Sequence, residues 1–550
     1  MKVYEALAKA FAAEGVTDVF GMMGDANLYW IDRLDKLGVK TYEVRHESGA
    51  LNMAQGYARI TGKVGVCTTT SGPGVTQLAT SMTIASRAQT PIVVFAGESP
   101  TADDDYVQRI NQERFAEAIE AGFVRVLSGE NVLDAVQKAF YRAKLESRPI
   151  MLSVPMDVQQ KTMDDDAMDD YVPSSQVLQI KRTMPDPADV VAAADLIAAS
   201  EKPVILVGRG AIASDAGQAV LELAHRTGAL ITTTLMAKNW LNDDPYHAGI
   251  SGTYGTRTAL ELFQDADVVI AVGASLNKHT TAAGYLYPGA RYVHLDTRRH
   301  VMLGGGGSAD IYLQTDATLG VEALSKELAS RDHSATGYRT EDVKLRLAQA
   351  YDDPETYELQ PGTVDPREVC LMLDKMMPSN VGLVLGSGQN VCFSTMLFNE
   401  PRDLLLPNQF FGSIGQGITS TIGAAVGSGK PCFLMDGDVS LMMYLSEFET
   451  ACRYRLPVMI VILNDQAMGA ELHKMRVHGL DSDLAELTTP DLGEVAVALG
   501  GRGRLARTLD DVRDAAQEFL DSPAPTIIDV RISNNVISVP YRRLHYGQDA

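Results

Sequence analysis

The fold of this chain is decided by residues 431–465, which read PCFLMDGDVSLMMYLSEFETACRYRLPVMIVILND. Two short apolar runs, 431–436 and 457–463, enclose a stretch with helical character at 441–455. Apolar runs of this length predict strands buried on both faces, and a helix between two such strands predicts a parallel sheet. Further runs of the same kind lie at 64–67, 91–95, 203–207, 268–272 and 526–530. The sequence therefore predicts an α/β protein.

Two stretches interrupt this alternation of strands and helices. Residues 159–187 are polar and acidic and contain proline, and residues 330–365 show little apolar periodicity. Both compositions are typical of linkers between domains. The 550 residues are also too many for a single hydrophobic core. We therefore expect three doubly wound parallel-sheet domains, at 1–165, 185–332 and 362–545.

The composition argues against several classes of partner. The net charge is −22, which disfavours nucleic acid and anionic membrane surfaces. No run reaches the roughly 18 apolar residues that a membrane helix requires. The N-terminus carries Glu5 and Glu14 and resembles an amphipathic helix more than a signal peptide. The five cysteines are scattered, as free thiols in a reducing compartment are, so we expect a cytoplasmic protein.

Acidic side chains follow both strands of the opening stretch. Asp438 comes after the first strand and Asp465 after the second. Parallel strands end at one edge of the sheet, so these two acids are expected to meet there. Hard oxygen ligands of this kind suit Mg²⁺, while Gly437 permits a tight turn and the helix after Ser440 offers backbone N–H groups to a phosphate. Asp438 alone would more simply cap a helix, and the second acid favours a metal site.

This arrangement resembles a known cofactor motif. Gly437-Asp438-Val439-Ser440, followed by Asn464-Asp465, is similar to the Gly-Asp-Gly…Asn-Asn motif of thiamine-diphosphate enzymes, within the acetolactate synthase and pyruvate decarboxylase group. The resemblance implies that Mg²⁺ is bound by Asp438, Asp465 and the backbone carbonyl of Ala467. Asp465 stands where the family usually has Asn, which keeps an oxygen ligand and changes the charge balance.

The resemblance continues upstream of the motif. Residues 388–390 match a stretch that contacts the diphosphate, and residues 412–415 match one that supports the cofactor. It implies that Ile414 wedges between the two cofactor rings and that the Gly412 carbonyl accepts a hydrogen bond from the aminopyrimidine. Read without the family, Ile414 would be an ordinary core residue. The implied cofactor-binding residues are Gly388, Gln389, Asn390, Gly412, Ile414, Gly437, Val439 and Ser440.

The first segment carries the carboxylate that would start the chemistry. Arg45-His46-Glu47 and Ser71-Gly72-Pro73-Gly74 resemble the pyrimidine-binding domain of the same family, in which a Glu contacts the N1′ nitrogen. Protonation there lets the 4′-amino group become an imine, which removes the C2 proton to give an ylid. Glu47 would then have to be buried in apolar surroundings. The simpler alternative is a carboxylate at a helix N-terminus.

Two further acids match substrate-side positions of the decarboxylases. Asp25 matches an acid/base Asp of the first domain, and Glu471 matches a Glu beside the substrate. Both also fit a turn acid and a helix-start acid. The decarboxylases carry an adjacent His pair in the first domain, but residues 98–106 contain no histidine. That departure favours acetolactate synthase and its lyase relatives over simple decarboxylation.

The middle segment carries a weak dinucleotide pattern. Gly208-Arg209-Gly210 follows a predicted strand, but no acid follows at the distance that NAD binding requires. FAD-binding relatives have a Phe-Asp-Asp-Arg stretch where this chain has residues 275–279, SLNKH. These departures argue against both NAD and FAD.

Taken together, the resemblance implies an acetolactate-synthase-like carboligase or lyase that depends on thiamine diphosphate and Mg²⁺. It would act on 2-oxo acids or acyloin-type substrates through a C2 ylid and an enamine. In this family the active sites lie between subunits, which implies a homodimer or homotetramer. Three alternatives stay open: a 2-oxo acid decarboxylase, a non-catalytic assembly subunit, and a 2-hydroxyacyl-CoA-type lyase in which Arg542, Arg543 and His545 cover the CoA tail.

Overall fold

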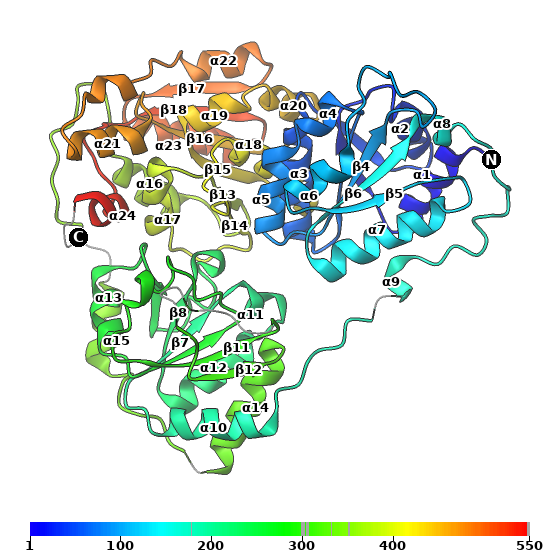
Figure 1. The fold of residues 1–550 in the computed structure, drawn as a ribbon. Helices are drawn as coiled ribbons and strands as arrows, with labels where there is room; N and C mark the ends of the chain where they lie inside the picture. The colour runs from blue at the N-terminus through cyan, green and yellow to red at the C-terminus, as the bar shows by residue number, and fades with distance from the viewer. Residues whose placement is uncertain (178, 299–302, 304–306, 332, 350–352, 547–550) are drawn as a thin grey trace.

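The computed structural model describes residues 1–550 apart from 178, 299–302, 304–306, 332, 350–352 and 547–550. The described residues form three six-stranded sheets flanked by helices (Figure 1), and the ladders between their strands are parallel. Each sheet begins at an interior strand and is wound outward to both edges. The predicted α/β fold with three doubly wound parallel sheets is therefore confirmed. The exact limits of the three expected domains remain a prediction.

The first sheet has the strand order β2-β1-β3-β4-β6-β5. Its strands are β1 (Asp18–Gly21), β2 (Lys40–Glu43), β3 (Gly65–Thr69), β4 (Ile92–Glu98), β5 (Gly122–Arg125) and β6 (Pro149–Pro155). Its helices are α1 (Val3–Ala13), α2 (Leu28–Lys36), α3 (Glu47–Thr61), α4 (Pro73–Thr76), α5 (Ala79–Arg87), α6 (Gln112–Ala118), α7 (Val132–Glu146), α8 (Met156–Gln159) and α9 (Ser174–Val177). One face packs against α3 and α5, and the other against α1 and α7.

The second sheet has the order β12-β11-β10-β7-β8-β9. Its strands are β7 (Pro203–Val207), β8 (Leu230–Thr233), β9 (His247–Ile250), β10 (Val268–Val272), β11 (Arg291–Asp296) and β12 (Ile311–Gln314). Its helices are α10 (Pro187–Ala198), α11 (Arg209–Ala213), α12 (Gly217–Thr227), α13 (Arg257–Gln264), α14 (Ala317–Ser330) and α15 (Glu341–Ala348). Separate apolar clusters cover its two faces.

The third sheet has the order β14-β13-β15-β16-β18-β17. Its strands are β13 (Gly382–Leu385), β14 (Leu405–Pro407), β15 (Cys432–Gly437), β16 (Val458–Asn464), β17 (Arg502–Ala506) and β18 (Thr526–Arg531). Its helices are α16 (Pro366–Met376), α17 (Gln389–Leu397), α18 (Gln416–Ser428), α19 (Asp438–Met443), α20 (Glu447–Arg453), α21 (Gly469–Val477), α22 (Leu492–Ala498), α23 (Leu509–Asp521) and α24 (Val539–Tyr541).

Helices α3 and α18 join the first and third sheets. A Cβ on Gly56 of α3 would lie 2.4 Å from the carbonyl oxygen of Ser420, so the two backbones approach directly. Apolar residues from both sheets and both helices form one continuous cluster, which includes Phe20 and Ile460. Figure 1 shows these two layers side by side, with the second sheet below them. The first and third sheets therefore share a hydrophobic core.

The expected linkers differ in their structure. Residues 159–187 run as a largely irregular connector between the end of α8 and the start of α10, and α9 is the one helix that lies wholly within its described residues (Figure 1). Residues 330–365 contain α15, whose Val343 and Leu347 are buried against the second sheet. This helix was missed because only those two apolar side chains, one turn apart, mark its buried face.

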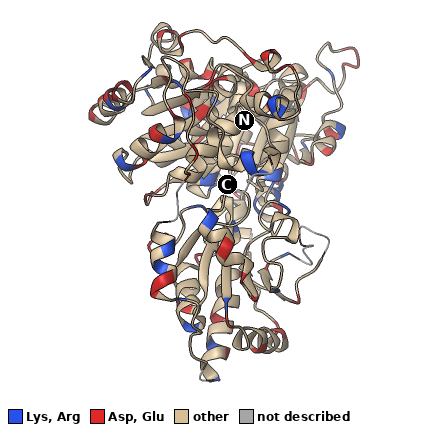
Figure 2. Ribbon diagram, turned by 90° about the vertical axis from the view of Figure 1, so that its left-hand side faces the viewer, with Lys and Arg blue, Asp and Glu red and all other residues tan. Residues whose placement is uncertain are grey.

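Charged side chains are distributed over all three sheets. Figure 2 shows both acidic and basic positions scattered over the upper and the lower part of the molecule. Within the described residues, no helix combines the length and the apolarity that crossing a membrane would take.

Candidate active site

The two predicted metal ligands meet at the C-terminal edge of the third sheet. β15 and β16 are neighbours with Gly437 paired to Leu463, so Asp438 and Asp465 leave adjacent strand ends. Their relative exposures are only 1% and 5%. Burial, and secondarily the charge of Asp465, raises the pKa of Asp438, and burial raises the pKa of Asp465. The two carboxyl groups therefore lie close enough to interact electrostatically.

The unsatisfied atoms at this edge fit a hard cation. Oδ2 of Asp438, Oδ1 of Asp465 and Oδ1 of Asn390 are buried without a hydrogen-bond partner. Buried polar atoms are normally paired, and oxygen atoms of this kind are the ligands that Mg²⁺ prefers. Ala467 lies in the same turn and its backbone N–H donates to Asp465. Among the described residues, no three acidic, histidine or cysteine side chains gather so that they could hold a metal ion, and this candidate site offers two carboxylates beside the Asn390 oxygen.

Asn390 connects the metal turn to the neighbouring strand loop. Gln389 and Asn390 begin α17, directly after β13, and the Asn390 side-chain amide donates to the Leu463 carbonyl at 2.9 Å. A Cβ on Gly469 would lie 2.4 Å from Asp465 and 3.6 Å from Asn390 Oδ1, so a glycine is needed there.

β13 and β15 flank the point at which strand order reverses, where open α/β sheets bind ligands.

The loop expected to support the cofactor lies beside this edge. Ile414 approaches Gly388, whose Cβ would be 3.9 Å from Ile414 Cγ2. Gly388 and Gly412 have φ values of 115° and 68°, which side-chain-bearing residues rarely adopt. Ile414 is partly buried and Gly412 is exposed. The structure thus brings together the stretches 388–390, 412–415 and 437–440 that were predicted to surround one cofactor.

Sequence reasoning missed Asp436, which ties two of these stretches together. Its carboxylate accepts the Gly437 N–H at 2.9 Å and the Ser440 hydroxyl at 2.7 Å, and Ser440 Oγ accepts the Gly415 N–H at 2.9 Å. Burial raises the pKa of Asp436 to about 7. Gly386 and Gly417 leave the space that its carboxylate occupies. The signal in the sequence was an acid at the end of an otherwise apolar strand.

The helix expected after Ser440 also differs from its prediction. Instead of one helix over 441–455, the structure has α19, which begins at Asp438, and α20, which begins at Glu447. The chain turns between them at Tyr444, whose φ and ψ are −133° and 28°. Val439 is partly buried and Ser440 is 3% exposed.

Glu47 and Asp25 lie at the C-terminal edge of the first sheet. Glu47 is the first residue of α3, and its Oε1 is 3.4 Å from the Cβ position of Gly74. The loop of Asp25 packs on the same turn, since a Cβ on Gly24 would lie 2.6 Å from Thr70. Glu47 is only partly buried and Asp25 is exposed. The apolar surroundings expected for Glu47 are therefore incomplete within one chain.

The substrate-side helix α21 carries one predicted acid and one residue without a predicted role. Glu471 is half exposed and lies 3.5 Å from Lys474. His473 is fully buried, with neither ring nitrogen hydrogen-bonded, and burial lowers its pKa to about 4. The imidazole of this histidine therefore packs into the interior of the protein from α21.

Two arginines of the basic cluster near the C-terminus, which the CoA-lyase alternative would place over a CoA tail, have partners within the chain. Arg542 is 4% exposed and pairs with Asp353, and Arg543 donates to the carbonyls of Thr253 and Gly255. Both guanidinium groups are used to join the C-terminal turn to the rest of the chain. The sequence could not reveal partners so distant along the chain.

Family models match all three segments of the chain. Residues 1–119 match the N-terminal TPP binding domain of thiamine pyrophosphate enzymes, residues 190–324 their central domain, and residues 386–530 their C-terminal TPP binding domain. The three matches occur in the order expected and cover most of the chain, including both candidate cofactor edges. This chain belongs to the thiamine pyrophosphate enzymes.

Similar proteins place the chain beside acetolactate synthases. A probable acetolactate synthase large subunit of Methanocaldococcus jannaschii is 29% identical, with 97% of this chain and 92% of the relative aligned. The sulfoacetaldehyde acetyltransferase of Alcaligenes xylosoxydans xylosoxydans is 27% identical, over 94% and 90% respectively. Acetolactate synthase isozyme 2 large subunit of Escherichia coli K12 is 28% identical, over 95% and 94%. As a thiamine pyrophosphate enzyme with these relatives, the chain is an enzyme that forms or cleaves C–C bonds.

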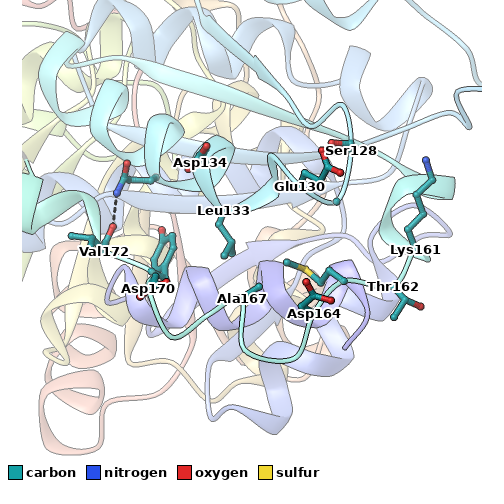
Figure 3. Close-up of a pocket in the computed structure, with 14 residues that line it drawn as sticks. Ser128, Glu130, Leu133, Asp134, Lys161, Thr162, Asp164, Ala167, Asp170 and Val172 are labelled. Carbon is teal, nitrogen blue, oxygen red and sulfur yellow. Dashed lines mark hydrogen bonds between the residues drawn. The ribbon is translucent and has the colours of Figure 1, made fainter.

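One cavity of this thiamine pyrophosphate enzyme lies away from the candidate site. It measures about 710 Å³ and lies between α7 and the connector at 161–172, on the face of the first sheet opposite α3 (Figure 3). Acidic side chains, including Glu130, Asp134 and Asp164, line it together with Lys161. It contains none of the residues predicted for the cofactor.

Proposed function

We propose that this chain is a carboligase or lyase, acetolactate-synthase-like, which acts on 2-oxo acids or acyloin-type substrates with thiamine diphosphate and Mg²⁺. The observation that carries this proposal is the buried pair Asp438 and Asp465, whose unsatisfied oxygens lie at the ends of β15 and β16, next to the strand-order reversal of the third sheet. The acetolactate synthase relatives support the substrate class. Its five free cysteines fit the reducing cytoplasm that we propose as its compartment.

The residues of the site have separable roles in this proposal. Asp438, Asp465 and the Ala467 carbonyl would hold Mg²⁺, and residues 388–390 and 437–440 would bind the diphosphate. When bound, thiamine diphosphate supplies the carbon nucleophile that attacks the substrate carbonyl. Glu47 would exchange a proton with the pyrimidine N1′ nitrogen, and Ile414 would hold the two rings in a bent arrangement.

We propose a homodimer as the smallest active unit, which can pair further into a homotetramer. Glu47 is partly exposed in the single chain, so a second copy that covers this edge would complete its apolar surroundings. In that arrangement Glu47 serves a cofactor held by the Asp438 and Asp465 of the partner subunit. Burial by the partner would favour the protonated carboxyl that proton exchange with a ring nitrogen requires.

Product analysis with pyruvate tests this proposal. The protein with thiamine diphosphate and Mg²⁺ is expected to form acetolactate, and EDTA is expected to abolish the reaction. Glu47→Gln should lower turnover by at least about 100-fold, since a positioned acid/base contributes that much. An equally active Glu47→Gln variant would rule out the proposed role of Glu47. No turnover with 2-oxo acids, acyloins, 2-hydroxyacyl-CoA esters or sulfoacetaldehyde would favour the assembly subunit instead.

A second candidate function is 2-oxo acid decarboxylation. It is favoured by Asp25 and Glu471, which match the proton-transfer acids of decarboxylases. Asp25 is exposed at the edge where Glu47 lies, and Glu471 is half exposed on the helix that follows the metal turn. Release of acetaldehyde from pyruvate, without acetolactate, would identify this activity.

A further inference from the structure

Glu447 is a fully buried acid that contacts the backbone leading into Glu47. It is the first residue of α20, on the third sheet, and its relative exposure is 0%. Its Oε1 accepts the backbone N–H of Arg45 at 3.0 Å and that of His46 at 2.9 Å. Its Oε2 accepts the Thr450 hydroxyl at 2.8 Å. One carboxylate from the third domain therefore binds the two residues directly before Glu47.

The surroundings of Glu447 are shaped to this contact. A Cβ on Gly49 of α3 would lie 2.6 Å from Glu447 Oε1, so a glycine leaves the space for the carboxylate. The Tyr444 hydroxyl bonds to the Ser48 side chain. The Tyr444 ring also meets the edge of the His46 ring, with centroids 5.4 Å apart and planes at 89°. The first turn of α3 is thus contacted both by Glu447 of α20 and by Tyr444, which lies just before that helix.

Burying a carboxylate at this position costs free energy, which a purely structural contact would not require. A buried charge loses its hydration, and the groups around Glu447 return only two backbone donors and one hydroxyl. Two successive N–H groups on one oxygen do fix the orientation of a turn, and a negative charge is favourable before a helix N-terminus. A displacement of about 1 Å in a reacting group can cost about 100-fold in rate, so such orientation matters if Glu47 is catalytic.

We propose that Glu447 is a positioning residue, which fixes the backbone at Arg45 and His46 and thereby aims the Glu47 carboxyl group. This inference rests on the proposed function of Glu47. In this proposal, the third domain of one chain orients the Glu47 carboxyl group of that same chain. The cofactor that Glu47 serves is held by the partner subunit.

The test compares variants of the holoenzyme. Glu447→Gln and Gly49→Ala should each lower kcat by about 10- to 100-fold, with KM and the calorimetric Kd for thiamine diphosphate changed by less than about threefold. The rate of C2-proton exchange of the bound cofactor, measured by NMR, should fall in parallel. Glu449→Gln is the matched control: its carboxylate lies two positions away and pairs with the Arg45 side chain at 2.7 Å, so all four quantities should stay within about twofold.

A double variant separates positioning from general stabilisation. If Glu447 acts through Glu47, then Glu47→Gln combined with Glu447→Gln should exchange the C2 proton no more slowly than Glu47→Gln alone. Additive losses, or unchanged exchange in both Glu447→Gln and Gly49→Ala, would overturn the inference. If Glu47→Gln alone leaves proton exchange unchanged, the proposed function of Glu47 fails instead, whatever the Glu447 variants do.

Discussion

Gly423 of α18 faces the backbone of Met53 in α3, so closely that a Cβ on Gly423 would stand 2.0 Å from the Met53 carbonyl oxygen. The neighbouring atom belongs to the backbone and cannot rotate away. The contact lies in the centre of the cluster that joins the first and third sheets. The position of the first sheet relative to the third, and with it the distance between their candidate cofactor-binding edges, therefore depends on the absence of a side chain at Gly423.

We predict that Gly423→Ala destabilises the protein by about 1–3 kcal/mol or more, because the added methyl forces two helices apart. The apparent melting temperature should fall by several degrees. Gly217→Ala is the control, since its Cβ would meet the Trp240 ring at an ordinary 3.4 Å. Equal melting temperatures of the two variants would contradict the close helix contact.

A second prediction concerns the buried carboxyl pair without metal. In EDTA, Asp465→Asn should raise the melting temperature, because it removes one of two like charges that oppose each other in a buried site. Asp529→Asn is the control in the same sheet: Asp529 pairs with Arg531 at 3.0 Å, so its loss should lower the melting temperature. Matching shifts in the two variants would show that the Asp438–Asp465 pair is not under repulsion.

Glu447 should make stability depend on pH. Burial raises its pKa to about 7 from an ordinary 4.5, against the hydrogen bonds from Thr450, Arg45 and His46 and the charge of Arg453. Because the folded-state pKa lies above the unfolded one, its contribution to stability is complete below about pH 4.5 and is lost as the pH rises to about 7. Relative to Glu447→Gln, the wild type should lose up to about 3 kcal/mol over that range.

Melting curves of both proteins between pH 4.5 and 8 measure this dependence. The difference between them should change with the titration and level off above it. A difference that is constant across the range would mean that Glu447 ionises at its ordinary pKa.

A fourth prediction separates the roles of the substrate-side acids. If Asp25 and Glu471 transfer protons, Asp25→Asn and Glu471→Gln should each lower turnover by about 100- to 10,000-fold and leave the Kd for thiamine diphosphate unchanged. Asp32→Asn serves as control, because Asp32 is exposed on α2 and pairs with Lys36 at 2.5 Å. Turnover equal to the control would assign both acids to the turn and helix-start roles.

Much of the fold could be predicted because its signals are local. The apolar runs at 431–436 and 457–463 became β15 and β16, and their pairing placed Asp438 beside Asp465 as parallel strand ends require. The site stretches around Gly388 and Ile414 could be named through motif resemblance. Local pattern and motif order were sufficient for these parts.

The parts that could not be predicted depend on contacts between distant residues. Nothing near Glu447 in the sequence indicates that it binds the backbone of Arg45 and His46. The burial of Arg542 likewise depends on Asp353, and the relay from Asp436 through Ser440 to Gly415 needs three separate loops. Such roles follow from tertiary packing, which residue type and spacing do not encode locally.

The shared core of the first and third sheets has a consequence for biosynthesis. The face of α3 that packs on α18 belongs to a cluster completed by residues such as Ile418, Leu434 and Ile460. The second sheet closes both of its apolar clusters with residues between 190 and 347. During synthesis on the ribosome, the second sheet and its helices can therefore fold as they emerge. The first sheet cannot bury the apolar face of α3 until the third sheet has been made. Nascent chains stalled before residue 416 should recruit chaperones through α3.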